Sequence, residues 1–380
     1  MPNTHQAPRR LVPLAAALAA AALLAVPAAS ASPGLLVGIL DDANTLNFPE
    51  QTFGTLKQLH AQVVRMNVSW RAVAPTRPAR PGDPADPAYR WETYDKAVSA
   101  ASASGIRVLL SIVGTPAWAN GGGPATRAPA SAADLHLFAY AAARRYSGTF
   151  AGPDRTPLPA VRLWLAWNEP NNPLYLAPQY VRAGGGWVMQ SARDYARICA
   201  AIYGGVHATG LSGEHVGCGA TAPRGNNDPR SSRPSVSPLV FLRAVKSAGL
   251  RRFDAWAHHP YAGSRFETPA SRPSSPTAIT LGNIGVLQAE LTALYGPKRL
   301  WLTEYGWQTN PPDALLGVSW AAQAAYLTQA VAIARRNPGI DMLVWFLLKD
   351  DPVLSGWQSG LETATGTRKP SFNAFRLSVR

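Results

Sequence analysis

Eight short apolar runs, separated mostly by stretches typical of helices, constrain the fold of this chain more than any other feature. They occupy residues 35–40, 62–70, 106–113, 161–167, 214–222, 253–257, 300–304 and 341–348. Runs of this length, rich in β-branched and aromatic residues, indicate buried strands, and strands that alternate with helices indicate a parallel sheet. Eight such units in one chain predict an α/β fold, the (β/α)8 or TIM barrel.

The alternative for the same alternation is an open, doubly wound sheet. That fold usually carries a glycine-rich phosphate loop after its first strand. Neither G-x-G-x-x-G nor G-x-x-x-x-G-K-[ST] stands after residues 35–40, and no G-x-S-x-G motif marks a nucleophilic serine. The barrel is therefore the favoured prediction, and irregular surface loops are expected at residues 75–87 and 172–186.

The amino-terminal segment has the pattern of a secretory signal peptide. Arg9 and Arg10 precede an apolar run over residues 11–26, and Ala29-Ser30-Ala31 provides small residues for cleavage. The alternative, a membrane anchor, is disfavoured because the run is short for a transmembrane helix. We therefore expect a signal peptide at residues 1–31 and a secreted, monomeric single-domain barrel over residues 32–380, without a further membrane span.

Charge and cysteine content narrow the possible partners. The formal net charge is +14, but the arginines are dispersed and form no dense basic block, so we expect no nucleic-acid partner. The only cysteines, Cys199 and Cys218, predict a disulfide in a secreted protein, with two buried thiols as the alternative. Two cysteines form no structural zinc site, and we expect no metal and no cofactor.

Two glutamates are the main functional signal. Glu169 ends the fourth run in the sequence WNEPN, and Glu304 ends the seventh in TEYGW. A carboxylate at the end of a buried strand is costly unless it has a use, and the carboxyl ends of barrel strands meet at one mouth. Arg65 lies inside the second run, where we expect it to face an internal carboxylate rather than to be a solvated edge residue.

Several polar and aromatic residues should meet these glutamates at the ends of the other strands: Arg65, Trp118, Asn168, His259, Tyr261 and Trp345. Trp118 is expected either to offer a flat apolar face to a ligand or simply to pack its loop. Paired carboxylates in such a mouth suit hydrolysis of a glycosidic bond, because one protonates the leaving oxygen while the other attacks the sugar or activates water.

With these motifs the chain resembles the glycoside hydrolases of clan A, the 4/7 superfamily, and is most similar to families 39 and 5. The stretches WNEPN, TPAW, HPY and TEYGW carry the resemblance, which spans nearly all of residues 32–380. It implies a retaining enzyme acting on a β-linked oligo- or polysaccharide. One departure from the pattern is Thr115-Pro116-Ala117-Trp118, which stands where many members have a histidine after the third strand.

The resemblance also implies a role for each matching residue. Glu169 would be the acid/base and Glu304 the nucleophile. Asn168 would bind the 2-hydroxyl of the sugar, and Trp345 would form the floor of its subsite. Tyr261 and His259 would orient Glu304, with His259 preferred over His258 because it shares strand parity with Tyr261.

Two alternatives use the same scaffold. One is a carbohydrate-binding protein without turnover, and the other is a transglycosylase. A catalytically dead copy would be expected to lose one of the two glutamates, and Glu169 and Glu304 are both present. Hydrolysis is therefore the favoured hypothesis.

Overall fold

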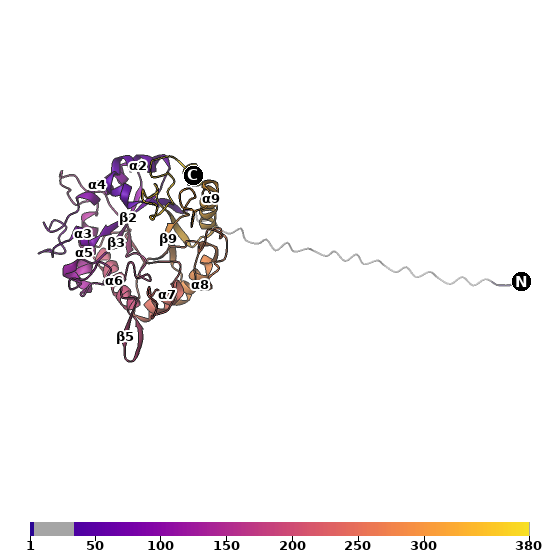
Figure 1. The fold of residues 1–380 in the computed structure, drawn as a ribbon, viewed down its shortest axis with the longest axis horizontal. Helices are drawn as coiled ribbons and strands as arrows, with labels where there is room; N and C mark the ends of the chain where they lie inside the picture. Colours follow the sequence, from indigo (N-terminus) through magenta and orange to yellow (C-terminus); the bar gives the residue numbers. More distant parts are fainter. Residues whose placement is uncertain (4–33, 380) are drawn as a thin grey trace.

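The predicted barrel is present. The computed structural model describes residues 1–3 and 34–379, and eight parallel strands close in the order β1-β10-β9-β8-β7-β4-β3-β2 (Figure 1). The strands are β1 (Leu36–Leu40), β2 (Val63–Ser69), β3 (Arg107–Val113), β4 (Leu163–Ala166), β7 (His215–Thr221), β8 (Ala255–His258), β9 (Arg299–Tyr305) and β10 (Ile340–Phe346). Closure excludes the open sheet. Apart from residues 1–3, the predicted signal peptide lies outside the described residues.

Helices surround the barrel, as Figure 1 shows. They are α1 (Asp42–Asn47), α2 (Pro49–Gln58), α3 (Trp70–Val73), α4 (Glu92–Ala103), α5 (Ala132–Arg145), α6 (Gln190–His207), α7 (Pro238–Ser247), α8 (Ile284–Tyr295), α9 (Trp320–Arg336) and α10 (Pro370–Ser378). Among residues 34–379 there are also two 3-10 turns, at Ala117–Ala119 and Leu281–Asn283. Within the described residues, no helix has the length and apolar character needed to cross a membrane.

Two apolar cores follow from the alternation of side chains along the strands. A larger core lies between sheet and helices, and a smaller one fills the barrel with residues that include Leu165, Trp301 and Val344. Gly217 is required by this packing, because a Cβ there would lie 2.6 Å from the Trp301 ring. The barrel is thus a packed core that supports a site above it.

One segment differs from the prediction. Part of the expected irregular stretch 172–186 forms an antiparallel hairpin, β5 (Tyr180–Ala183) with β6 (Gly186–Met189). Gly184 and Gly185 form its turn with φ of +58° and +77°, values that a two-residue hairpin turn needs and glycine readily adopts. The hairpin projects from the barrel in Figure 1. The run of glycines was the sequence signal for it.

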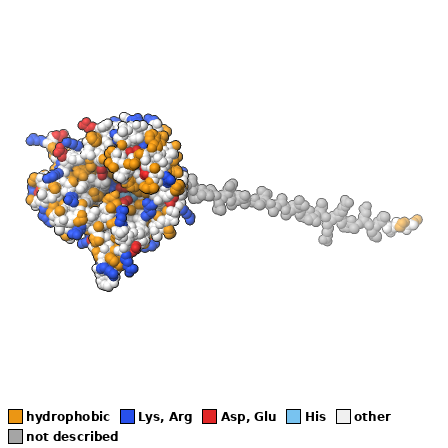
Figure 2. Space-filling view, viewed as in Figure 1, with side chains coloured by type: hydrophobic (Ala, Val, Ile, Leu, Met, Phe, Trp, Pro, Cys, Tyr) orange, Lys and Arg blue, Asp and Glu red, His pale blue; other side chains and the backbone are white. Residues whose placement is uncertain are grey.

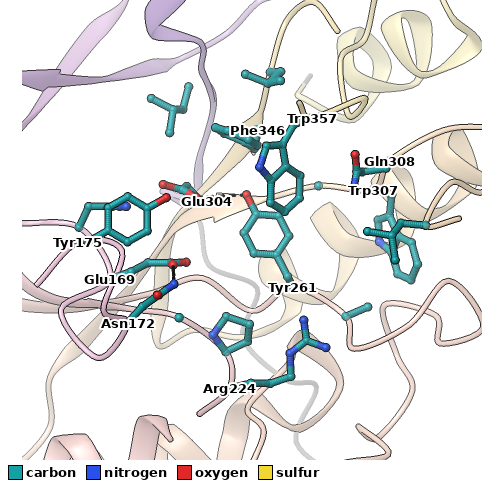
Figure 3. Close-up of a pocket in the computed structure, with 18 of the residues that line it drawn as sticks. Glu169, Asn172, Tyr175, Arg224, Tyr261, Glu304, Trp307, Gln308, Phe346 and Trp357 are labelled. Atoms are coloured by element: carbon teal, nitrogen blue, oxygen red, sulfur yellow. Dashed lines mark hydrogen bonds between the residues drawn. The ribbon is translucent and has the colours of Figure 1, made fainter. Parts of the chain in front are cut away.

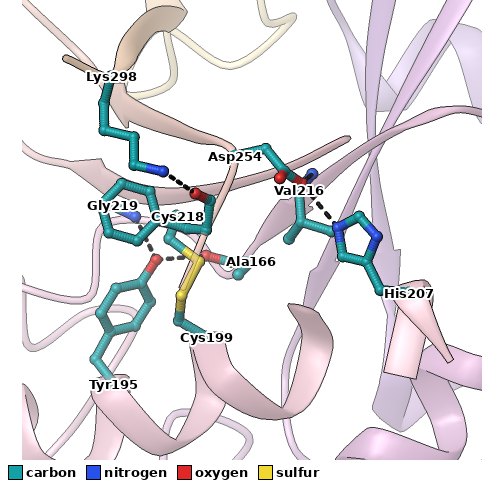
Figure 4. The surroundings of a disulfide bond; sticks show 10 residues. Ala166, Tyr195, Cys199, His207, Val216, Cys218, Gly219, Asp254 and Lys298 are labelled. Carbon is teal, nitrogen blue, oxygen red and sulfur yellow. Dashed lines mark hydrogen bonds and ion pairs between the residues drawn. A yellow bond between two sulfur atoms is a disulfide. The ribbon is translucent and has the colours of Figure 1, made fainter. Parts of the chain in front are cut away.

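A disulfide joins Cys199 on α6 to Cys218 on β7, with the two Cα atoms 6.0 Å apart (Figure 4). Beside it, the Tyr195 hydroxyl donates to the carbonyl of Ala166 and accepts from the amide of Gly219. Helix α6 is therefore tied to the barrel by a covalent bond and by hydrogen bonds. The predicted disulfide is present, and the alternative of two buried thiols is excluded.

We expect removal of this bond to lower stability without changing the site. The bond links residues 19 apart in sequence, and closing a loop of that size contributes about 3 kcal/mol to the free energy of unfolding. The double variant Cys199→Ala/Cys218→Ala should lose about this amount in denaturant unfolding. Reduced wild-type protein, which keeps every side-chain atom, is the matched control. Equal stability of oxidised and reduced protein would contradict the prediction.

Candidate active site

A cavity of about 560 Å³ opens at the carboxyl ends of the barrel strands. Both predicted glutamates lie in its wall (Figure 3). Asn168 lines the same cavity. Aromatic side chains surround them: Tyr175, Tyr261, Trp307, Phe346 and Trp357. A cavity of this size, with a few convergent polar groups, is typical of a small-molecule or saccharide site.

The backbone positions Glu169 in an unusual way. Trp167 and Glu169 adopt φ of +70° and +37°, in the left-handed region that non-glycine residues rarely occupy. The Trp167 amide donates to Ile112 at 3.0 Å and the Glu169 amide to Ala220 at 2.9 Å, so neighbouring strands hold this turn. Pro170 then prevents continuation of the strand. Such strain concentrates at functional sites.

A β-bulge turns Glu304 toward the cavity. Trp301 faces the barrel interior, so regular alternation would direct Glu304 outward. The register between β9 and β10 shifts after Leu302, with one more residue on β9 than on β10 before Tyr305 pairs with Trp345. Bulges next to active sites commonly re-aim a side chain in this way.

Arg65 is the centre of the hydrogen-bond network. Its side chain is fully buried, and Nη1 donates to Glu304 Oε1 at 2.9 Å and to the carbonyl of Thr303 at 3.0 Å. Nη2 donates to Asn168 Oδ1 at 2.7 Å, and Nε donates to Ser111 Oγ at 3.0 Å. The prediction that Arg65 faces an internal carboxylate is confirmed. A buried charge with these partners is compensated, and it orients Glu304 and Asn168.

His259 lies between the two glutamates. Its Nδ1 is 3.1 Å from Glu169 Oε1 and 3.5 Å from Glu304 Oε2. Burial lowers the pKa of His259 to about 3, so the ring is neutral at physiological pH. The Arg65 guanidinium only donates, so Nε2, which is 3.2 Å from Nη1, accepts and Nδ1 carries the proton. His258 instead contacts Thr221 and the Ile279 carbonyl, away from the cavity.

The two carboxyl groups have different surroundings. Burial raises the pKa of Glu169 from 4.5 to about 7, although Asn172 Nδ2, which donates to Oε2 at 3.0 Å, and the charge of Arg65 oppose the rise. Glu304 receives the Arg65 ion pair and a 3.3 Å hydrogen bond from the Tyr261 hydroxyl. Near neutral pH, Glu169 can therefore hold a proton, whereas Glu304 is paired with the buried Arg65 guanidinium.

The spacing of these groups limits what the site can do. One oxygen of each glutamate and one His259 nitrogen all lie within 4.8 Å of one another. Three such donors could approach a metal ion, but the cation would have to share Glu304 with the buried Arg65 guanidinium 2.9 Å away. The set therefore suits proton transfer and nucleophilic attack better than metal binding.

The structure does not bring two expected residues to the cavity. Trp118 packs edge-on against Trp70, donates to the Ala74 carbonyl at 2.8 Å and lies under the Arg77 guanidinium. Trp345 is fully buried and donates to the Ser359 carbonyl at 2.9 Å. Its position on β10 turns it outward, because its neighbours Val344 and Phe346 face the barrel interior.

Other residues contribute to the site that the sequence reasoning did not select: Asp42, Asn172, Arg224 and Trp357. Asn172 follows Glu169 by three residues in a tight turn, since its amide donates to the Glu169 carbonyl at 2.9 Å. The spacing of three residues in a turn after Pro170 could therefore have indicated that Asn172 lies beside Glu169. Trp357 comes from the loop after β10 and lies 5.4 Å, centroid to centroid, from Tyr261. Because this loop is irregular, the sequence pattern does not predict that Trp357 reaches the cavity.

The comparisons with known proteins concern the fold. No family model matches the chain, and no curated protein sequence matches it. The structure is similar to a family 39 glycoside hydrolase from the gut symbiont Bacteroides cellulosilyticus WH2, with a TM-score of 0.64 and 20% identity. That match covers 90% of this chain and 63% of the other, so this chain spans less than two thirds of that protein.

Two further solved structures have the same architecture. An endo-β-1,4-glucanase from Xanthomonas axonopodis pv. citri matches with a TM-score of 0.57 and 15% identity, covering 91% of this chain and 99% of that one. A GH5_18 protein from Bifidobacterium longum subsp. infantis matches with a TM-score of 0.60 and 14% identity, covering 91% and 78%. These neighbours include the two families that the sequence motifs resemble, and they share the (β/α)8 fold of this chain.

Proposed function

We propose that this protein is a retaining glycoside hydrolase that cleaves a β-linked oligo- or polysaccharide. The carrying observation is the pair Glu169 and Glu304. One is a carboxyl group whose pKa burial raises to about 7, and the other is held by Arg65. Their nearest oxygens are no more than 4.8 Å apart. This upper limit on the nearest oxygens is compatible with the separation of about 5–5.5 Å between the two carboxyl groups of retaining enzymes.

The reaction then has two steps. In the first, a Glu304 oxygen forms a bond to the anomeric carbon while the bond to the leaving oxygen breaks and Glu169 gives that oxygen its proton. In the second, Glu169 takes a proton from water, which attacks the anomeric carbon and frees Glu304. Arg65 and Tyr261 hold Glu304 in place, since both donate to its carboxylate.

Other cavity residues position the sugar in this proposal. Arg65 occupies the Asn168 Oδ1 acceptor at 2.7 Å, so the amide Nδ2 is the group left to bind a sugar hydroxyl. Trp357 lines the cavity beside Tyr261 and is 44% exposed, so its ring is accessible for stacking on a sugar. In this proposal Trp357, rather than Trp345, provides the aromatic surface of the sugar subsite. The β-linkage also has support from the structural likeness to an endo-β-1,4-glucanase.

The direct test follows the stereochemistry of the product. We expect wild-type protein to release sugar from at least one member of a panel of aryl β-glycosides and β-linked wall polysaccharides. Proton NMR of the first product should show the β-anomer before mutarotation. An initial α-anomer would exclude retention. Binding without release would favour the carbohydrate-binding alternative, and transfer to an added acceptor sugar in place of release would favour the transglycosylase.

We expect the activity to depend on pH through Glu169. Its pKa is raised to about 7, mainly by burial, so the proton needed by the leaving group is present below that pH and lost above it. The value of kcat/KM should fall about tenfold for each pH unit above about 7. In Asn172→Ala the Glu169 carboxylate loses the hydrogen bond from Asn172, which lowers its pKa in the wild-type protein. The pKa of Glu169 should therefore rise, and the fall in kcat/KM should begin at a higher pH. A limb near the ordinary glutamate pKa of about 4.3 would contradict the assignment.

A further inference from the structure

Charged residues are divided between opposite sides of the cavity. Asp41 and Asp42 follow β1, whereas Arg224 follows β7 and Arg265 follows β8, and all four line the cavity. In the barrel order, β7 lies four strands from β1 in either direction. The cavity lining therefore has acidic side chains on one side and guanidinium groups on the opposite side. On the outer surface, by contrast, basic side chains are dispersed over the visible face (Figure 2).

The two arginines retain donors for a ligand. Arg224 Nη1 donates to the Gly263 carbonyl at 2.8 Å, and Arg265 Nη1 donates to the Ala314 carbonyl at 2.9 Å. Among residues 34–379, neither guanidinium has a carboxylate oxygen within 4.0 Å. Each guanidinium has five N–H groups, so several remain for an anion. Figure 3 shows Arg224 at the cavity wall below Tyr261.

The nearby acid Glu267 feels the charge of Arg224, which helps to lower the pKa of Glu267, but it forms no ion pair with Arg224 within 4.0 Å. Glu267 accepts from the amide of Gly263 at 2.7 Å and from the amide and hydroxyl of Ser274, each at 3.0 Å. Its carboxylate is thus engaged in holding its own loop. Arg224 is exposed at the cavity and is preorganised by its bond to Gly263, as a binding guanidinium should be.

The position of Arg224 relates it to one end of the substrate. Arg224 follows β7, which pairs directly with β4, the strand that Glu169 follows. Glu304 lies on β9, which is two strands from β7. In the proposed function Glu169 protonates the leaving oxygen. Arg224 therefore lies on the side of the leaving group.

We propose that Arg224 and Arg265 form a subsite for an anionic group on the leaving-group sugar, so that the substrate is an acidic β-glycan. A uronate carboxylate or a sulfate ester has the planar or multidentate oxygens that guanidinium groups bind. This inference rests on the proposed function for the direction of the substrate. The binding of the anion itself does not depend on turnover.

The test compares acidic oligosaccharides with matched neutral ones. The probes are β-linked uronate oligosaccharides and their carboxyl-reduced forms, together with sulfated oligosaccharides and their desulfated forms. Binding is measured by calorimetry on the Glu304→Gln background, and on wild-type protein at low temperature if that variant does not fold. We expect an acidic probe to bind about tenfold or more tightly than its neutral partner, and the difference to shrink at high salt.

Variants then assign the effect to the subsite. Arg224→Gln should remove most of the preference for the acidic probe, and Arg224→Gln/Arg265→Gln should abolish it. Arg230→Gln is the matched control, because Arg230 lies on the same loop as Arg224 but outside the cavity lining. This variant should keep the wild-type preference for acidic over neutral probes. Equal binding of acidic and neutral probes, no binding of acidic probes, or an equal loss in Arg230→Gln would overturn the proposal.

The two proposals fail in different ways. If wild-type protein binds acidic probes through Arg224 but releases no sugar from them, the hydrolase proposal fails and the anion subsite stands. If acidic and neutral glycans are cleaved with equal kcat/KM, and Arg224→Gln changes neither value, hydrolysis stands and the subsite is excluded.

Discussion

Glu304→Gln should abolish turnover, with kcat lower by about 10⁴-fold or more. The amide is nearly the same shape as the carboxylate but does not form the glycosyl–enzyme bond, so the first step of the reaction is lost. The measurement is the rate of release from the most active glycoside of the panel, with wild-type protein assayed in parallel. A variant that keeps its rate would show that another group is the nucleophile.

The controls for this variant address folding as well as chemistry. Replacing Glu304 leaves the fully buried Arg65 without its carboxylate partner 2.9 Å away, and breaking a buried ion pair costs about 3–5 kcal/mol. Thermal unfolding must therefore accompany the assay. Glu304→Asp keeps the charge but withdraws the oxygen, and a displacement of about 1 Å should cost about 10²-fold in rate. Glu290→Gln, on the outside of α8 and paired with Arg243, should leave the rate unchanged.

The effect of Glu169→Gln should depend on the leaving group, which is the second large effect we expect. Glycosides with poor leaving groups need a proton in the first step, so their kcat/KM should fall by about 10²- to 10⁴-fold. A dinitrophenyl glycoside needs no proton, so its kcat/KM should change little. Its turnover should nevertheless slow, because the variant has no base to activate water in the second step.

Azide separates the two steps in this variant. The small anion attacks the glycosyl–enzyme without a general base, so it should restore turnover of the dinitrophenyl substrate and yield a β-glycosyl azide. The basic limb of the pH profile should also disappear, since the group with the pKa of about 7 is gone. A loss of the same size for good and poor leaving groups would instead assign Glu169 a positioning role.

Much of the fold was predictable because it is encoded locally. Each strand of the barrel is a short apolar run, and proline or glycine ends many of these runs, so eight strands and their order follow from the chain alone. Where local signals were weaker, the prediction was incomplete. The hairpin β5–β6 was missed because strands of four residues have too little periodicity to recognise, which left the glycines of the turn as the only local signal.

The site residues that lie at the ends of barrel strands could be predicted from the sequence. Arg65, Asn168, Glu169, His259, Tyr261 and Glu304 all lie on or directly after barrel strands, and the structure brings them into one network. Trp345 also lies on a strand, yet its parity turns it away from the cavity. Glu304 would have turned outward as well without the bulge in β9. Sequence spacing alone does not reveal such a register shift.

By itself, the sequence determined the eight strands, the carboxyl ends at which chemistry can occur and the two glutamates placed there, since these features depend on neighbouring residues. Only the tertiary structure decided the Cys199–Cys218 bond, the proton position on His259 and the joining of Asn172, Arg224 and Trp357 to the cavity. These depend on contacts between residues far apart in the chain and on loop conformations. Such features follow from packing, in which the whole barrel takes part, rather than from local propensity.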